Sequence, residues 1–175
     1  MSYDLVLFGL PKPANPAQFC EQLQEQEEQR ILDEEGSSAR PLDERVRARM
    51  QKLADSLKSL SSGFEQFEPP SPAPWIELTD EKHEVQVTIS EQAVHITLPY
   101  FRSELREKLS LVARCVETLH RDAGLVAFDP QLGRVVTADD MGLLEKQYRD
   151  MDRHLPEITA RKEEASQKKS WWKLW

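Results

Sequence analysis

The stretch Gly124–Val136, GLVAFDPQLGRVV, carries the strongest indication of the fold in this sequence. Gly124 follows a long helical pattern, at the position where helices commonly end in a left-handed residue. The apolar run over 125–128 predicts a short strand that breaks at Asp129 and resumes at residues 134–136. We expect the Asp129 side chain to accept backbone hydrogen bonds in the intervening turn. The stretch therefore predicts the closing strand of a small α+β domain.

Two alternating runs, over residues 84–89 and 93–98, predict a β-hairpin upstream of this stretch. Every second residue in each run is apolar, as in a strand with one buried face. Residues 75–78 predict a further piece of strand. Residues 3–10 barely alternate and predict a first strand that is buried on both faces.

Three segments before Gly124 have the composition or spacing of helices, over about residues 16–35, 41–60 and 103–122. The second and third carry apolar residues every three or four positions, so we expect them to pack on the sheet. The first is strongly acidic with a thin apolar side, which predicts a position at the edge. A further helix is expected after Thr137.

Removing one N-terminal helix from this order leaves β-α-β-β-α-β, the split β-α-β or ferredoxin-like order. We therefore predict an α+β domain over residues 1–137, with helices on one face of an antiparallel sheet. Residues 138–175 are predicted to form a C-terminal helical extension with a Trp-rich end. The proline-rich segment over 68–74 is expected to cross the domain rather than to separate two domains.

The composition suits a folded, acidic protein. The hydrophobic content is 39%, the charged content is 31% and the net charge is -8. This charge argues against binding to nucleic acid, which requires a basic face. It suits a soluble protein, or one that meets a basic partner by electrostatic steering. The N-terminus has no basic segment typical of a secretion signal, and no apolar run approaches the roughly 18 residues that span a bilayer. These features predict a cytoplasmic protein.

Catalytic and cofactor-binding patterns are missing from the sequence. No His or Cys pair has metal-ligand spacing, and no glycine-rich phosphate loop occurs. The acidic pair Asp139–Asp140 is interpreted as a helix cap rather than a cation site. We therefore expect no enzyme activity, no cofactor and no metal. An enzyme of unrecognised type stays open as a third reading, which a pocket lined by Asp129, His95 or Tyr100 would favour. The four histidines are scattered along the chain: His83, His95, His120 and His154.

The two cysteines, Cys20 and Cys115, lie inside helical patterns beside apolar neighbours. Free cysteines in such places are usually small buried hydrophobic residues, and that is the interpretation we favour. Their spacing leaves a disulfide between them open.

Two surfaces are candidates for binding a partner. One is the acidic face of the first helix, where charge complementarity would speed association with a basic protein. It comprises Glu21, Glu25, Glu27, Glu28, Asp33, Glu34 and Glu35. The other is the C-terminal tail, a basic segment that ends in three tryptophans and has the composition of a membrane-surface or partner contact. Its aromatic residues are Trp171, Trp172 and Trp175. Docking of this tail back on the domain, or an unstructured end, stays open as the alternative.

The N-terminal YDLVLFG, the tryptophan after the proline-rich segment and the GLVAFDPQLGRVV stretch together resemble a group of small bacterial proteins of poorly defined function. In that group a YDL strand opens the domain and a DPQ-containing strand closes it. Relatives of this kind are encoded beside polymorphic or contact-delivered toxins, where they are thought to act as immunity proteins. The resemblance covers the layout of residues 1–137, and it assigns no functional residue.

These observations predict a non-enzymatic binding protein, namely an immunity protein that occludes the active site of a basic toxin domain with its acidic helix. The alternative is a scaffold or assembly component that contacts a membrane or a partner through its Trp-rich tail.

Overall fold

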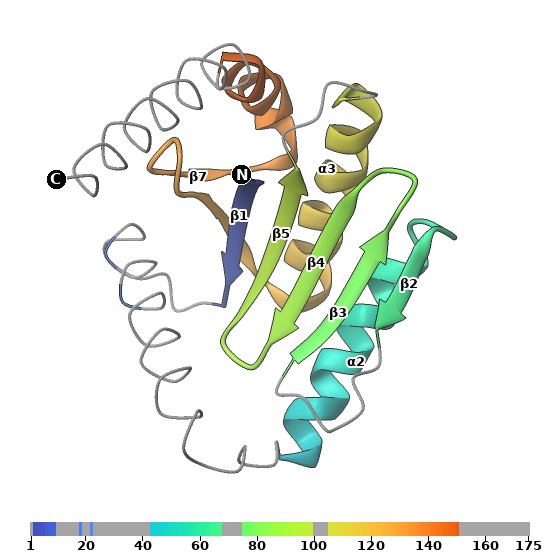
Figure 1. The fold of residues 1–175 in the computed structure, drawn as a ribbon. Coiled ribbons are helices and arrows are strands. Elements are labelled where there is room, and N and C mark those ends of the chain that lie inside the picture. Colours follow the sequence, from blue (N-terminus) through green and yellow to red (C-terminus); the bar gives the residue numbers. More distant parts are fainter. Residues whose placement is uncertain are drawn as a thin grey trace, which may run out of the picture.

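A computed structural model of the chain describes residues 2–9, 18, 22, 43–67, 75–99 and 105–150. In these residues, a seven-stranded antiparallel sheet carries two long helices on one face (Figure 1). The predicted α+β class is confirmed. In chain order the elements are β1 (Ser2–Phe8), α2 (Glu44–Lys58), β2 (Phe64–Phe67), β3 (Trp75–Asp80), β4 (Val85–Ser90), β5 (Ala93–Pro99), α3 (Leu105–Ala123), β6 (Val126–Asp129), β7 (Arg134–Val136) and the 3-10 turn η1 (Ala138–Asp140). A helix over residues 141–150 follows η1.

The strand order across the sheet is β2-β3-β4-β5-β1-β6-β7, so the first strand of the chain lies in its interior. β1 pairs with β5 on one side and with β6 on the other, both antiparallel. The predicted hairpin is confirmed as β4 and β5, which pair antiparallel. The predicted ferredoxin-like order counts four strands, whereas this sheet has seven, and that finer assignment stays a prediction.

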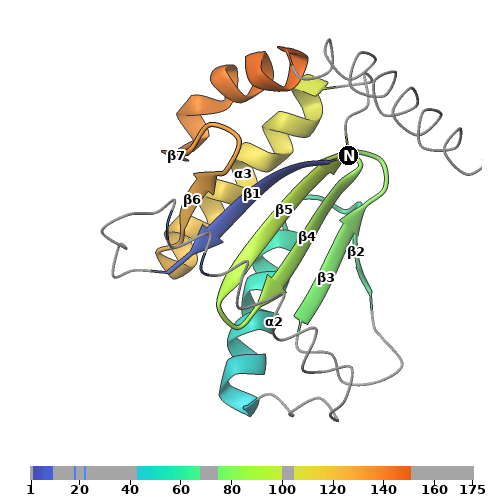
Figure 2. The same cartoon turned by 60° about the vertical axis from the view of Figure 1, so that its left-hand side comes forward.

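α2 and α3 lie on the same face of the sheet, as Figures 1 and 2 show from two directions. Their apolar stripes have the helical spacing predicted from sequence, and they bury against alternate residues of the strands. The resulting main core includes, from the helices, Met50, Leu53, Leu57, Leu109, Val112, Val116 and Leu119, and, from the strands, Leu5, Leu7, Leu78, Val87, Ile89, Ile96 and Leu98. The buried apolar residues of both helices and of the central strands thus form one continuous core.

The Gly124–Val136 stretch forms a hairpin of β6 and β7 rather than one closing strand. Gly124 and Gly133 have φ angles of 64° and 63°, a left-handed conformation that glycine adopts without steric cost. Gly124 therefore ends α3 as predicted, and Gly133 allows the chain to reverse. β2 was not predicted, and it adds an edge strand beyond β3.

The segment after Thr137 also packs on the main core. Leu144 and Tyr148 of the helix over 141–150 are buried in the same cluster as Tyr3. The Asp140 carboxylate accepts hydrogen bonds from the Thr137 backbone N–H and hydroxyl, at 2.9 and 3.0 Å, which confirms the predicted capping role of this residue. The boundary proposed at residue 137 stays a prediction. The predicted helix over 16–35, the 68–74 connector and residues 151–175 lie outside the described residues, apart from Gln18 and Gln22.

A buried hydrogen bond joins the two ends of the sequence resemblance. The Tyr3 hydroxyl of β1 donates to Asp129 Oδ2 at the end of β6. The other oxygen, Oδ1, accepts the backbone N–H groups of Gln131 and Leu132 at 2.8 and 2.9 Å. Asp129 is fully buried, so these bonds replace its contacts with water. The predicted structural role of Asp129 in the turn is confirmed.

We expect Tyr3→Phe to lower the free energy of unfolding by about 1–3 kcal/mol, because it leaves a buried carboxylate oxygen without its donor. Asp129→Ala should cost more, since it also removes both turn bonds. In urea denaturation, the double variant should be less destabilised than the sum of the two single variants, with a coupling of about 0.5–3 kcal/mol. Strictly additive effects would show that the hydroxyl and the carboxylate do not interact.

Candidate functional site

The face of the sheet opposite the helices carries side chains in rows that cross the strands. The register places one such row from the β2 edge to the β7 edge. This row consists of Phe67, Glu77, Thr88, His95, Val6, Phe128 and Val135. We call this face the open face. Its chemistry changes along the row, from aromatic and acidic at β2 and β3, through polar at β4 and β5, to apolar at β1, β6 and β7.

The apolar end of the open face forms a second buried cluster. Phe8 and Phe128 are its large members, and Val6 and Ala93 complete it. All four side chains are at least nine-tenths buried, although the two long helices lie on the other face of the sheet. This half of the open face is therefore not available for a partner.

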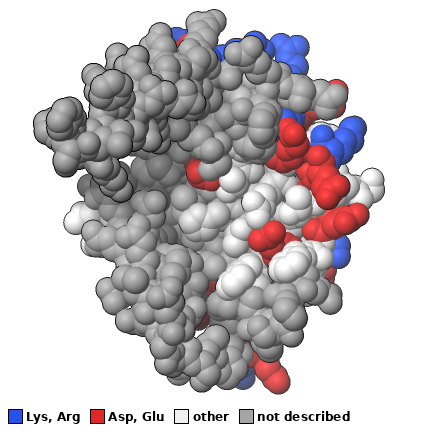
Figure 3. All heavy atoms as spheres, in the orientation of Figure 1, with Lys and Arg blue, Asp and Glu red and all other residues white. Residues whose placement is uncertain are grey.

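The other end of the open face is exposed. Phe67 and Trp75 are 53% and 37% exposed, and they are two of the three large apolar side chains that stand out from the described surface. Glu77 lies opposite Phe67 in the register, and Glu65 lies two residues before Phe67 on the same side of β2. We call Glu65, Phe67, Trp75 and Glu77 the β2–β3 surface. Figure 3 shows acidic side chains gathered over this part of the molecule.

The charged side chains of the β2–β3 surface are all acidic. On β2 to β5, the open face carries two carboxylates, polar and aromatic residues and Ala93, with no Lys or Arg among the described positions. Within the described part of the chain, neither Glu65 nor Glu77 forms an ion pair. Exposed aromatic side chains are enriched in protein interfaces, where a polar rim surrounds them.

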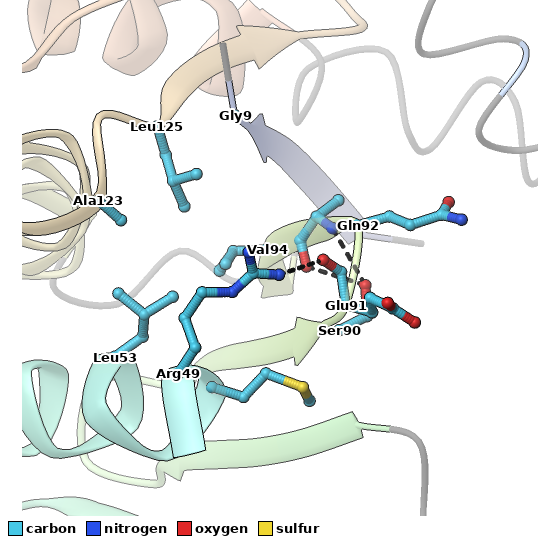
Figure 4. Close-up of a pocket in the computed structure, with 11 residues that line it drawn as sticks. Gly9, Arg49, Leu53, Ser90, Glu91, Gln92, Val94, Ala123 and Leu125 are labelled. Carbon is cyan, nitrogen blue, oxygen red and sulfur yellow. Dashed lines mark hydrogen bonds between the residues drawn. The ribbon is translucent and has the colours of Figure 1, made fainter. Parts of the chain in front are cut away.

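A small pocket of about 250 Å³ lies at the end of the sheet where β4 turns into β5 (Figure 4). Its walls come from α2, the β4–β5 turn and the chain that leaves α3. The Arg49 side chain crosses its mouth and donates to the Glu91 backbone carbonyl at 3.0 Å. The Ser90 hydroxyl is held by the turn, since it donates to the Ala93 carbonyl and accepts the Ala93 N–H. Most of the remaining lining is apolar, including Met50, Leu53, Val94 and Leu125.

This pocket does not bring together the groups that acid–base or nucleophilic catalysis requires. Neither Asp129 nor His95 is among its lining residues, and Tyr100 lies outside the described residues. Its volume is also below the roughly 300 Å³ typical of small-molecule sites. The pocket therefore gives no support to the hypothesis of an enzyme of unrecognised type.

A second polar cluster surrounds the buried carboxylate of Asp80, at the end of β3. The Ser61 hydroxyl donates to Oδ2 at 2.6 Å, and the His83 backbone N–H donates to Oδ1 at 2.9 Å. His83 Nδ1 lies 2.9 Å from Oδ2, at an angle outside hydrogen-bond geometry. Gly63 packs so closely that an added Cβ would lie 2.7 Å from the carboxylate. The cluster therefore ties the α2–β2 loop to the β3–β4 turn.

Serine, histidine and aspartate meet in this cluster, but not in a catalytic order. A nucleophilic serine is activated by an adjacent histidine, which the aspartate orients from its far side. Here the Ser61 hydroxyl donates to the carboxylate itself, and His83 faces the same oxygen. Burial acts to raise the pKa of Asp80, but hydrogen bonds from Ser61 and His83 outweigh it and hold that pKa below its usual value. We interpret the cluster as structural.

The same β3–β4 turn is held to α3 by a buried cation. The Lys108 ammonium, on a side chain that is only 1% exposed, pairs with the carboxylate of Glu84. Glu84 has a φ of 50°, the one positive value among the described non-glycine residues. A buried lysine is tolerated only when it is paired, which explains its position beside this carboxylate. Lys108 was not recognised from sequence because it interrupts an otherwise apolar stripe.

Most candidate site residues of the sequence lie outside the described part of the chain. This holds for every acidic residue proposed on the first helix, Glu21, Glu25, Glu27, Glu28, Asp33, Glu34 and Glu35, and for the tail residues Trp171, Trp172 and Trp175. Their proposed roles stay predictions. The β2–β3 surface was missed, because β2 itself was not predicted.

The described histidines and cysteine do not converge on one site. His120 Nδ1 lies 2.9 Å from the Leu125 carbonyl at the end of α3, and His95 lies in the middle of the open face. Cys115 is a free, buried thiol, and burial raises its pKa to about 12, so it is an inert core residue as predicted. Cys20 lies outside the described residues. Among the described residues, no three His, Cys, Asp or Glu side chains are placed to hold a metal ion.

The described helices are all too short or too polar to cross a membrane. Neither a protein-family model, nor a curated protein, nor a solved structure matches the chain.

The Asp80 cluster makes stability depend on pH. The folded-state pKa lies below the unfolded value of about 3.9, so the ionised carboxylate stabilises the fold fully above that value. This contribution is lost as the pH falls through the lower folded-state pKa. At pH 7, Asp80→Asn should lower the free energy of unfolding by about 1–3 kcal/mol. In urea titrations between pH 7 and 2.5, the gap between the two proteins should narrow below about pH 4. A gap that stays constant over this range would contradict the assignment.

Gly63 and Gly142 form a matched pair for testing the packing around Asp80. Gly63→Ala should destabilise the protein by about 1–3 kcal/mol, because the new methyl group meets the Asp80 carboxylate. A Cβ at Gly142, in the helix over 141–150, meets nothing within 4 Å. Gly142→Ala should therefore be neutral or stabilising by up to about 1 kcal/mol. Thermal denaturation of both variants checks this contrast. Equal shifts in melting temperature for the two variants would contradict it.

Proposed function

We propose that this chain is a non-enzymatic binding protein, and specifically an immunity protein that neutralises a bacterial toxin by covering a basic site on it. The β2–β3 surface is the observation that carries this proposal. It presents two exposed aromatic side chains, Phe67 and Trp75, between two carboxylates, Glu65 and Glu77. The resemblance of the YDL and DPQ segments to products encoded beside toxins supports the same function.

The physical basis is the complementarity of charge and apolar area. A toxin that acts on nucleic acid or on another anionic substrate presents Lys and Arg around its active site. Carboxylates placed opposite such residues speed association and select the partner. Aromatic side chains at the centre of the contact supply the apolar area that slows dissociation. The acidic first helix proposed from sequence is a second candidate for an acidic binding surface.

The test is a co-expression experiment with the toxin encoded next to the gene of this chain. Cells that carry the toxin should survive only when this chain is present, and the two proteins should co-purify. The double variant Glu65→Lys/Glu77→Lys should lose protection, with affinity reduced at least tenfold in titration calorimetry. Glu25→Lys/Glu27→Lys/Glu28→Lys tests the contribution of the first helix in the same assay.

Glu107→Lys/Glu117→Lys is the matched control, since it makes the same charge change at exposed positions of α3, on the other face of the sheet. This control should protect cells as well as the wild type does. Absence of protection by the wild-type chain would overturn the immunity function. Protection that survives both the β2–β3 and the first-helix reversals would overturn an acidic binding surface.

We also propose that the centre of the sheet is a ferredoxin-like split β-α-β unit to which further strands have been added. β1 and β4 both run antiparallel to β5, so they are parallel to each other with β5 between them. α2 lies between β1 and β4 in the chain, and α3 connects β5 to β6. β2 and β3 would then be an insertion before β4, and β7 an addition after β6.

A further inference from the structure

The β2 strand ends the sheet on the side of the β2–β3 surface. It pairs only with β3, so its outer backbone N–H and C=O groups have no strand partner among the described residues. Natural proteins protect such edges with very short strands, charged residues, proline or a covering element, because an open edge pairs with other chains. β2 is four residues long, Phe-Glu-Gln-Phe, without proline or lysine, and its one charge, Glu65, repels acidic strands and attracts basic ones. Its backbone is therefore competent to accept another strand.

The side chains beside this edge specify what kind of strand it accepts. Glu65 and Phe67 point to the open face of β2. Gln66 points to the helix face, where its side-chain oxygen accepts a hydrogen bond from the Gln51 amide of α2 at 3.1 Å. A strand added beside β2 would present every second side chain to the open face. Those side chains would meet one carboxylate and one exposed aromatic ring, two residues apart. Lys or Arg satisfies both positions, since its charge pairs with Glu65 and its stem or cation packs on Phe67.

The second row of the surface extends this preference inward from the edge. Trp75 and Glu77 on β3 lie on the same face as Phe67, with Glu77 directly opposite it and Trp75 diagonal to it. An added strand would lie two strands, roughly 10 Å, from β3. The extended side chains of Lys or Arg and of Glu77 together span this distance across Phe67. Because the open face of β2 to β5 carries no described Lys or Arg, nothing on that face repels such a side chain.

We propose that the β2 edge binds an extended, basic segment of the partner protein as an additional strand, with Lys or Arg alternating on the open face. The inference rests on the proposed function for the identity of the partner, but not for the binding mode. Main-chain hydrogen bonds along β2 provide affinity, and the β2–β3 surface provides selectivity for basic and apolar side chains. The segment recognised is thus defined by two properties, an extended backbone and a basic residue at every second position.

A synthetic peptide tests the binding mode without the toxin. The probe is a labelled nine-residue peptide in which Thr alternates with Lys, and fluorescence anisotropy measures its binding to the full-length chain. We expect saturable binding that weakens at least tenfold for Glu65→Lys/Glu77→Lys and for Phe67→Ser/Trp75→Ser. The Glu107→Lys/Glu117→Lys control should bind as the wild type does. All substituted positions except Glu77 are exposed, and circular dichroism checks that each variant folds.

Two altered peptides separate strand addition from simple charge attraction. A peptide with Glu in place of Lys should not bind, and a peptide with N-methylated backbone amides should lose at least tenfold in affinity. Equal binding of the methylated peptide, or no binding of the basic peptide at millimolar concentration, would overturn the proposal. Peptide binding without protection from the toxin would overturn the immunity function and leave the β2 edge site standing. Protection from the toxin without peptide binding would overturn the β2 edge site and leave the immunity function standing.

Discussion

The hydrogen bond between Tyr3 and Asp129 fixes the last hairpin beside the first strand, and the remaining structure depends on that placement. It joins residues 126 positions apart in the sequence, at the end of the sheet where β1 begins and β6 ends. Because the carboxylate also holds the turn into β7, one buried aspartate fixes both the last hairpin and its place beside the first strand. Without that placement, β1 would be an edge strand, and the second apolar cluster around Phe8 and Phe128 would lose one of its walls.

Buried polar groups are concentrated at this same end of the sheet. Asp80 and Glu84 flank the β3–β4 turn, and the antiparallel pairing places this turn at the end of the sheet where β1 starts. Each buried charge holds together segments that apolar packing alone does not fix: Asp80 holds two loops, Lys108 holds a turn to α3, and Asp129 holds β6 to β1. The opposite end is held mainly by apolar contacts and contains the small pocket beside Arg49. Directional polar contacts thus fix the arrangement of the segments at one end of the sheet, whereas apolar packing holds the other end.

Local pattern was sufficient to predict the parts of the fold that local physics determines. The alternation over 84–98 identified the β4–β5 hairpin, and helical spacing identified the buried stripes of α2 and α3. The position of Gly124 after a helix and the Asp129 turn were also recognised correctly. In each case the residues that decide the structure are neighbours in the sequence.

The features that escaped prediction are set by pairing between distant segments. β2 is only four residues long and lacks a repeating pattern, so its assignment depends on β3. Phe67 and Trp75 face the same way only because β2 and β3 pair across a proline-rich segment, and Asp80 looks like an ordinary polar turn residue until Ser61 and Gly63 enclose it. The order of strands carries the same limitation, because nothing near residues 2–8 indicates that β5 and β6 will flank them.

That strand order has a consequence for synthesis on the ribosome. β1 emerges first, yet its two neighbours in the sheet are β5 and β6, so an apolar strand must wait for most of the chain before either side is paired. Sheets dominated by such distant pairings form slowly, and their folding intermediates expose hydrophobic surface that is prone to aggregate. The nascent chain therefore has a built-in period during which a chaperone that holds hydrophobic segments would protect its future centre.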